Sequence, residues 1–239
     1  MKGVLLAGGR GTRLLPLTKL TNKHLLPIFD KQMVYYPLLT LRKAGIREVL
    51  ILTTPQHLKD FKKLLGDGKE LKMKLSYKIQ KEASGIAHAL ALSKSFVGKD
   101  NLALILGDNI FEENFSAAFK SFKSGGRIFL KAVKDPQRFG VATLAGKKVV
   151  EIIEKPKNPK TNLAVVGLYL YDARVFDIVK NLKPSQRGEL EITDVNNWFV
   201  KAGEIDSRNV KGKWMDAGTF ESLVSASEYV SKNPNRFAL

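Results

Sequence analysis

The sequence contains no cysteine and only three histidines. The lack of cysteine excludes disulfides, a thiolate nucleophile and cysteine-based metal sites, and a histidine-rich metal site is not expected either. No apolar run approaches the ~18 residues that a membrane-spanning helix needs. The N-terminus also lacks the long apolar region of a secretory signal, so we expect a cytoplasmic protein.

Acidic residues are scarce relative to basic ones. The 239 residues include 40 lysines and arginines against 23 aspartates and glutamates, which gives a formal net charge of +17. Such an excess raises the question of nucleic-acid binding. The basic residues are spread along the chain, however, and no run of five like charges and no helix-turn-helix pattern occurs. We interpret the excess as a solvated lysine-rich surface that is compatible with attraction of small anions. We expect neither a nucleic-acid nor a membrane partner.

Linkers and internal repeats are also missing. No segment rich in glycine, serine or proline separates two parts of the chain, and hydrophobic residues make up 44% of it. This composition is sufficient for a large core. We therefore expect a single domain over residues 1–239.

The first half of the sequence alternates between short apolar runs and helical patterns. Strands are expected at 4–7, 48–54, 75–80 and 101–107, and helices at 33–45, 56–66 and 85–96. In the second half, strands are expected at 127–134, 149–156, 163–172 and 205–210, and helices at 174–181, 189–203 and 219–232. The alternation predicts an α/β fold, Rossmann-like and doubly wound, with a mixed and mostly parallel sheet.

The segment GGRGTR directly follows the first predicted strand. Ligands of open α/β sheets bind beyond the carboxyl ends of the strands, and glycines let backbone N–H groups approach a phosphate closely. The segment lacks both the Walker ending and the third glycine of a dinucleotide fingerprint. The planar guanidinium of Arg13 and the ammonium of Lys23 could bind phosphate oxygens. The alternative is an ordinary glycine turn with solvated cations.

Two aspartates are candidate metal ligands. Asp108 ends a buried strand, and Mg²⁺ is typically held by one or two carboxylates together with substrate phosphates. The alternative for Asp108 is a helix cap. Asp216 lies in WMDAGT, where an aspartate is most often a turn residue, and the spacing does not prove that the two carboxylates meet.

Further charged residues admit two interpretations each. Glu154 and Lys155 end a predicted strand and could form either part of a site or a surface ion pair. Arg187 precedes a predicted helix, where it could meet an anion at the N-terminus or simply be solvated. The histidines have no serine or acidic partner that suggests a triad, so we assign them no catalytic role.

Eight motifs occur in order from end to end: LAGGRGTRLLPLT, Lys23 before HLLP, LILGDN, FGVA, EKP, VVGLYLYD, RGELEITD and WMDAGT. Together they resemble the sugar-1-phosphate nucleotidylyltransferases over nearly the whole chain. RGELEITD with LGDNIF is similar to the glucose-1-phosphate thymidylyltransferase branch of that family.

The resemblance implies a reaction of dTTP with α-D-glucose 1-phosphate that gives dTDP-glucose and pyrophosphate, the entry step to dTDP-rhamnose. A phosphate oxygen of the sugar phosphate would attack the α-phosphorus in line, with Mg²⁺ as the cofactor and no covalent enzyme intermediate. Catalysis would then consist of positioning and charge stabilisation.

The resemblance also implies roles for individual residues. Arg13 would hold the β- and γ-phosphates, Lys23 would neutralise the α-phosphate, and Asp108 and Asp216 would bind Mg²⁺. The implied nucleotide-binding residues are Leu6, Gly8, Gly11, Gln80 and Gly85. The implied residues for glucose and its phosphate are Asn109, Gly140, Glu154, Lys155, Val165 and Arg187.

Some features depart from the family pattern. Ile153 stands where many members have a second glutamate, and Leu15 stands where a tyrosine is common. The chain is similar to short members without the C-terminal regulatory segment, so we expect weak or absent feedback inhibition. The family forms dimers and tetramers, which allows a homo-oligomer. UTP in place of dTTP remains open, because thymine and uracil differ by one methyl group. A nucleotide-sugar sensor without turnover is the alternative from another class.

Overall fold

The computed structural model describes residues 1–239, and these form two compact units. The N-terminal unit consists of Lys2–Ala83, Ile105–Phe119 and Lys211–Leu239. The central unit consists of Met1, Ser84–Leu104 and Lys120–Val210. The expectation of a single domain over the whole chain stays a prediction.

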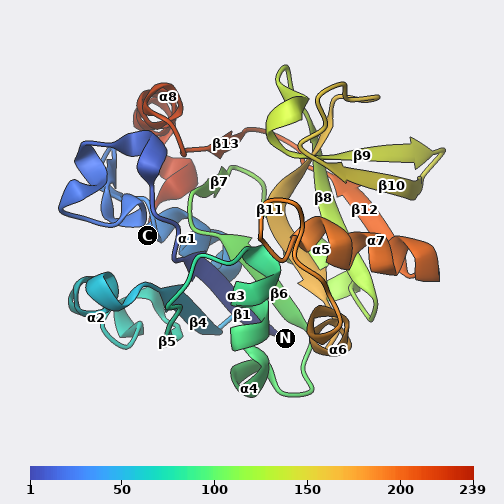
Figure 1. The fold of residues 1–239 in the computed structure, drawn as a ribbon. Coiled ribbons are helices and arrows are strands. Elements are labelled where there is room, and N and C mark those ends of the chain that lie inside the picture. Colours follow the sequence, from blue (N-terminus) through green and yellow to red (C-terminus); the bar gives the residue numbers. More distant parts are fainter. The chain divides into compact units, whose positions relative to one another are not determined.

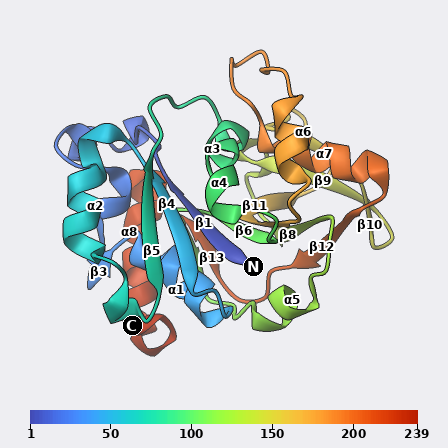
Figure 2. The same cartoon turned by 90° about the horizontal axis from the view of Figure 1, so that it is seen from below.

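Parallel strands form the centre of the N-terminal unit. Strands β1 (Lys2–Ala7), β4 (Glu48–Thr53) and β5 (Lys74–Ile79) pair in that order, as Figure 2 shows. Helix α1 (Tyr35–Lys43) packs against β1, and α2 (Leu58–Leu65) packs against β5. Five of the six residues in β1 and in β4 are buried, as expected for strands covered on both faces. All three strands end on the same edge, where the glycine segment begins.

Two small antiparallel pairs complete this unit, of which Figure 1 labels β7 and β13. Strand β7 (Asn109–Phe111) pairs with β13 (Trp214–Asp216), and β2 (Pro27–Ile28) pairs with β3 (Lys31–Gln32). Helix α8 (Phe220–Lys232) packs against β2 and β13. Thr219 caps α8, because its hydroxyl accepts a hydrogen bond from the backbone N–H of Ser222.

The central unit contains a mixed sheet. Its strands are β8 (Gly126–Ala132), β9 (Gly140–Ala145), β10 (Lys148–Glu154), β11 (Leu163–Tyr171) and β12 (Ile205–Asn209). The order is β10-β9-β11 with antiparallel pairs; β8 is also antiparallel to β11, and β12 runs parallel to β8. Its helices are α3 (Ile86–Leu92), α4 (Lys94–Val97), α6 (Val175–Lys180) and α7 (Ile192–Ala202). Helix α7 packs against β10 and β12 (Figure 1).

Two elements contain residues of both units: strand β6 (Leu102–Leu106) and helix α5 (Ser116–Ser121). Seven short 3₁₀ helices lie at Thr12–Leu14, Leu17–Lys19, Lys23–Leu25, Pro55–His57, Lys69–Leu71, Pro136–Arg138 and Pro234–Phe237. None of the helices combines the length and the apolar character that crossing a membrane requires.

The predicted α/β fold with a mixed sheet is confirmed, and its parallel strands are concentrated in the N-terminal unit. The prediction missed β9 entirely and treated β13 as a turn. The helix predicted over 189–203 begins at Ile192, because the preceding residues form a turn. The helix predicted over 85–96 is divided at Ser93 into α3 and α4.

Candidate active site

The glycine segment after β1 bends tightly around neighbouring side chains. Gly11 has φ +66°, and a Cβ atom there would lie 2.9 Å from the Thr18 methyl group. The Thr18 hydroxyl group also donates a hydrogen bond to the Gly11 carbonyl oxygen at 2.9 Å. The position therefore needs glycine both for its left-handed backbone and for space.

Gln80 lies directly over Gly8. A Cβ atom on Gly8 would lie 2.4 Å from Oε1 of Gln80, and the Gln80 side chain is buried. Its Nε2 atom donates to the carbonyl oxygen of Glu82 at 2.9 Å. Leu6, at the end of β1, is also buried. The structure thus places three of the predicted nucleotide-binding residues, Leu6, Gly8 and Gln80, at one edge of the parallel strands.

A cavity of about 310 Å³ opens beside this edge. The sequence analysis named Gly8 and Gln80 as nucleotide-binding residues and included Gly9 and Arg10 in the segment GGRGTR. The other lining residues are Thr18, Thr21, Asn22, Thr54, Gln56, His57, Lys81 and Ala83. Cationic side chains and hydroxyl groups in the wall suit a polar anionic ligand. Apart from Gln80, the lining residues outside the motif LAGGRGTRLLPLT were not predicted, because they belong to loops after β1, β4 and β5 that carry no separate signature.

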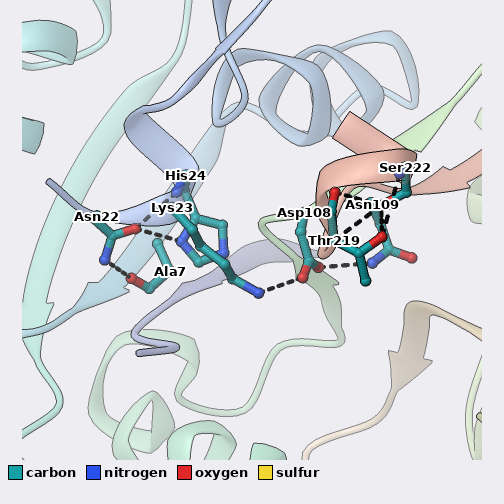
Figure 3. A network of polar contacts seen from close by, with 8 residues as sticks. All are labelled: Ala7, Asn22, Lys23, His24, Asp108, Asn109, Thr219 and Ser222. Atoms are coloured by element: carbon teal, nitrogen blue, oxygen red, sulfur yellow. Dashed lines mark hydrogen bonds and ion pairs between the residues drawn. The ribbon is translucent and has the colours of Figure 1, made fainter. Parts of the chain in front are cut away.

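Lys23 runs along the glycine segment and ends on Asp108. Cβ atoms on Gly9 and Gly11 would lie 3.3 Å and 3.1 Å from carbon atoms of the Lys23 side chain. The Lys23 ammonium donates to Oδ2 of Asp108 at 2.5 Å (Figure 3). The structure therefore joins a predicted phosphate ligand and a predicted metal ligand that lie 85 residues apart.

A buried histidine fixes the backbone beside Lys23. Oδ1 of Asn22 accepts from the His24 backbone N–H at 2.9 Å and lies 2.7 Å from His24 Nδ1. The amide of Asn22 donates to the Ala7 carbonyl oxygen at 3.0 Å, as Figure 3 shows. Burial, followed by the Lys23 charge, lowers the pKa of His24 to about 3, so the ring is neutral at pH 7.

Asp108 is ionised in spite of its burial. Burial alone raises the pKa of this carboxyl group. The Lys23 charge, a smaller effect of His24, and hydrogen bonds from Lys23 and Asn109 outweigh burial and hold the pKa well below its usual range. A buried carboxylate is thus available at the start of β7.

Asp216 occupies a neighbouring position on the paired strand. It lies opposite Asn109 in the β7–β13 pair, and the next backbone N–H, of Ala217, donates to the Asp108 carbonyl oxygen at 2.9 Å. No cluster of three acidic, histidine or cysteine side chains suitable for a metal exists in the structure. Asp108, one residue before β7, and Asp216, on β13, are carboxylates of the kind that Mg²⁺ binds together with phosphates and water.

Arg13 reaches the same strand pair at Gly218. A Cβ atom on Gly218 would lie 2.8 Å from Nη2 of Arg13 and 2.9 Å from Oδ1 of Asp216. Arg13, predicted to bind the pyrophosphate, and Asp216, predicted to bind the metal, therefore both lie against Gly218. Asn109 extends the group, because its Nδ2 donates to Asp108 at 3.0 Å and its Oδ1 accepts from the Trp214 indole at 2.7 Å.

The central unit carries the residues predicted for glucose and its phosphate except Asn109, which lies in the N-terminal unit. Glu154 lies opposite Gly140 in the β9–β10 pair, and its Oε2 accepts the Thr193 hydroxyl at 2.5 Å. A Cβ atom on Gly140 would lie 3.2 Å from that hydroxyl oxygen and 3.4 Å from Glu154 Oε2. Val165, on β11, is buried. Thr193 was not predicted, because its partner lies 39 residues away.

Two basic side chains lie next to Glu154. The Lys155 ammonium is 3.8 Å and Arg187 Nη1 is 3.7 Å from Glu154 Oε1. Lys155 has φ +41°, a left-handed conformation that is uncommon for a residue with a side chain. Such conformations cost free energy and are concentrated at functional sites.

Gly85, the remaining predicted nucleotide-binding residue, precedes α3 in the central unit. It has φ +101°, and a Cβ atom would lie 2.4 Å from the Leu190 carbonyl oxygen. The same oxygen accepts from the Ala87 backbone N–H at 3.1 Å. Gly85 therefore permits close packing of the chain against the RGELEITD segment.

The sequence matches the nucleotidyl transferase family over residues 2–233. It is 44% identical over 243 residues to the glucose-1-phosphate thymidylyltransferase of Neisseria meningitidis serogroup A, which covers 98% of this chain and 84% of that protein. A solved structure described as a glucose-1-phosphate thymidylyltransferase from Bacillus anthracis, in complex with sucrose, has a TM-score of 0.91 and 47% identity over 96% of this chain and 94% of that one. A UDP-glucose pyrophosphorylase complexed with UDP-glucose has a TM-score of 0.85 and 26% identity over 97% and 98% of the two chains. The chain therefore belongs to the nucleotidyl transferase family.

Proposed function

We propose that the chain is a glucose-1-phosphate thymidylyltransferase of the cytoplasm. It transfers a thymidylyl group from dTTP to glucose 1-phosphate and releases pyrophosphate. The observation that carries this proposal is the arrangement at β7 and β13. Cationic Arg13 and Lys23 lie against the same short strands that carry the carboxylates Asp108 and Asp216.

The chemistry requires no protein nucleophile. A phosphate oxygen of the sugar phosphate forms a bond to the α-phosphorus of dTTP. The bond from that phosphorus to the bridging oxygen breaks, and pyrophosphate leaves with the electron pair. The protein contributes alignment of the reacting atoms and stabilisation of negative charge.

The N-terminal unit supplies the residues for the nucleotide. Backbone N–H groups at Gly8 and Gly11 approach the phosphates, since neither residue has a side chain to obstruct them. The Gln80 amide has the donor and acceptor pattern needed at a pyrimidine edge, and Leu6 contributes apolar surface. Gly85 lies in the central unit and stays a predicted nucleotide-binding residue. Arg13 stabilises the departing pyrophosphate, and Lys23 neutralises charge at the α-phosphate.

Asp108 and Asp216 would hold the magnesium ion. When bound, Mg²⁺ supplies Lewis-acid stabilisation of charge on the phosphate oxygens. Asp108 would then have both Lys23 and the metal as partners; in the structure its carboxylate pairs with Lys23 at 2.5 Å. Asn109 orients the Asp108 carboxylate through its hydrogen bond to Oδ1.

The central unit supplies the residues for the sugar phosphate. Glu154 accepts hydrogen bonds from glucose hydroxyl groups, with Thr193 fixing its second oxygen atom. Gly140 and Val165 shape the surface next to Glu154. The role of Asn109, which lies in the N-terminal unit, at the sugar stays a prediction from the resemblance. Lys155 and Arg187 bind the phosphate group of glucose 1-phosphate.

UTP is the second candidate nucleotide. The similarity to a UDP-glucose pyrophosphorylase favours this alternative, but its 26% identity is lower than the 44% to the thymidylyltransferase of N. meningitidis. A single methyl group separates the two bases, which amounts to roughly 10- to 200-fold of discrimination in an apolar pocket.

The test is pyrophosphate release with Mg²⁺ and glucose 1-phosphate, comparing kcat/KM for dTTP, UTP, CTP, ATP and GTP. We expect the highest value for dTTP and no turnover after chelation of the metal with EDTA. Equal values for dTTP and UTP would support the same chemistry with a broader nucleotide range. An absence of release with every nucleotide would refute the proposed activity and favour a non-catalytic sensor.

A further inference from the structure

Three carboxylates surround the guanidinium group of Arg187. Its Nη2 atom lies 3.2 Å from Oε2 of Glu189, and its Nη1 atom lies 3.4 Å from Oε1 of Glu191 and 3.7 Å from Oε1 of Glu154. All four residues belong to the central unit. The positive charge of Arg187 is therefore already compensated before any phosphate binds.

Two of these carboxylates have other partners. Glu154 accepts the Thr193 hydroxyl at 2.5 Å, and Glu191 accepts the Ser185 hydroxyl at 2.9 Å. Glu191 is also buried at the residue that precedes α7. The carboxylate of Glu189, in contrast, interacts with Arg187 alone, and its side chain is 34% exposed. Of the three, only Glu189 can leave Arg187 without losing another contact.

A tight turn places the two side chains together. The Ser185 backbone N–H donates to the Glu189 carbonyl oxygen at 2.8 Å, and the Gly188 N–H donates to the Ser185 carbonyl oxygen at 2.9 Å. Gly188 has φ +72°, which closes the turn between Arg187 and Glu189. The turn is held by backbone atoms, so rotation of the Glu189 side chain towards solvent leaves it intact.

We propose that Glu189 is a positioning residue that acts through Arg187 and sets the affinity for the sugar phosphate. The Glu189 carboxylate pairs with the guanidinium group of Arg187 when the phosphate is absent. It must move away from that group when the phosphate binds. This inference rests on the proposed function, in which Arg187 binds the phosphate of glucose 1-phosphate.

The competition has a predictable direction. A phosphate group that binds Arg187 has to displace Glu189 or accept its negative charge as a neighbour, and both oppose binding. Glu189→Gln keeps the shape of the side chain and removes the charge. Since the pair is partly exposed, the expected effect is that of a surface ion pair, a decrease of about two- to fivefold in KM for glucose 1-phosphate.

The experiment compares Glu189→Gln with Glu151→Gln. Glu151 is an exposed glutamate on β10 that pairs with Lys160 at 3.3 Å and contacts no proposed substrate ligand. For Glu189→Gln we expect the lower KM for glucose 1-phosphate with unchanged kcat and unchanged KM for dTTP. Added KCl should reduce the difference from wild type, because salt screens the charge. Glu151→Gln should leave all three constants unchanged.

A double variant separates competition from a purely structural role. In an Arg187→Gln background, Glu189→Gln should have a smaller effect, because there is no cation left to release and only charge repulsion remains. An unchanged or raised KM in the single variant, or a gain of the same size without Arg187, would overturn the inference. If Arg187→Gln itself leaves the KM for glucose 1-phosphate unchanged, the assignment of Arg187 in the proposed function is wrong as well.

Discussion

Gly218 lies against two of the proposed catalytic groups of the N-terminal unit. A Cβ atom would lie within 3 Å of both Arg13 Nη2 and Asp216 Oδ1. Gly218→Ala should therefore displace both groups while the fold is retained, since the atoms that must move are the ends of side chains. We expect kcat to fall about ten- to a hundredfold, the cost of a small misplacement of reacting groups. Steady-state kinetics together with the melting temperature provide the measurement.

The control for this prediction uses Arg13. If Gly218 acts by placing Arg13, the alanine substitution at 218 should cost much less in an Arg13→Ala background than in the wild type. Full additivity of the two effects would instead assign the loss to Asp216 alone or to the backbone. An unchanged kcat in Gly218→Ala would show that the close approach has no role in turnover.

Among the secondary-structure elements, predictability follows burial. Strands β1, β4 and β6 were predicted within two residues of their ends, because continuous apolar runs buried on both faces are a strong signal. Strands β7 and β13 have three residues each, and they exist because they pair with one another across about a hundred residues of sequence. No local pattern specifies such a pair, so Asp216 was predicted in a turn.

Asp172 joins three elements of the central unit, and its charge gives a pH-dependent prediction. It follows β11, accepts the Gly125 N–H before β8 at 2.6 Å, and accepts from Arg174 Nη2 before α6 at 2.7 Å. Burial by itself raises the pKa of Asp172, but hydrogen bonds from Arg174 and Gly125 outweigh it and hold the pKa below its usual range. The folded state therefore favours the ionised form.

The sign of the effect follows from this lowered pKa. The contribution of Asp172 to stability is complete above the unfolded-state pKa of about 4 and is lost as the pH falls through the lower folded-state value. Asp172→Asn should reduce the free energy of unfolding by about 1–3 kcal/mol at pH 7, and the difference from wild type should shrink below about pH 4. Urea unfolding at pH 7, 5 and 3.5 provides the measurement.

The control is Asp177→Asn, at an exposed aspartate that pairs only with exposed Lys94, and it should show no such trend. A difference between Asp172→Asn and wild type that does not depend on pH would contradict the argument.

For the molecule as a whole, the sequence named candidate site residues but not the contacts that hold their side chains. The glycine segment, Lys23 and Asp108 carry recognisable motifs, and the structure brings them into contact. The partners that orient them were not predicted: Trp214 bonds Asn109 from 105 residues away, and Thr193 bonds Glu154. Single polar residues at such separations have no periodicity, so only the folded chain shows that they meet.

The net charge of +17 is also a property of the whole molecule. If it attracts the small anionic substrates, it should raise kcat/KM. Both proposed substrates are phosphates, and a positive field raises their local concentration. Raising KCl from 20 to 300 mM shortens the screening length from about 20 Å to about 6 Å. We expect kcat/KM for both substrates to fall about three- to tenfold with kcat unchanged, at constant free Mg²⁺.

A double-stranded DNA oligonucleotide should not inhibit at 150 mM KCl, because dispersed lysines cannot neutralise several adjacent phosphates. Inhibition by DNA that decreases steeply with the salt concentration would instead indicate that the basic surface binds nucleic acid. A salt-independent kcat/KM would show that the net charge has no part in substrate capture.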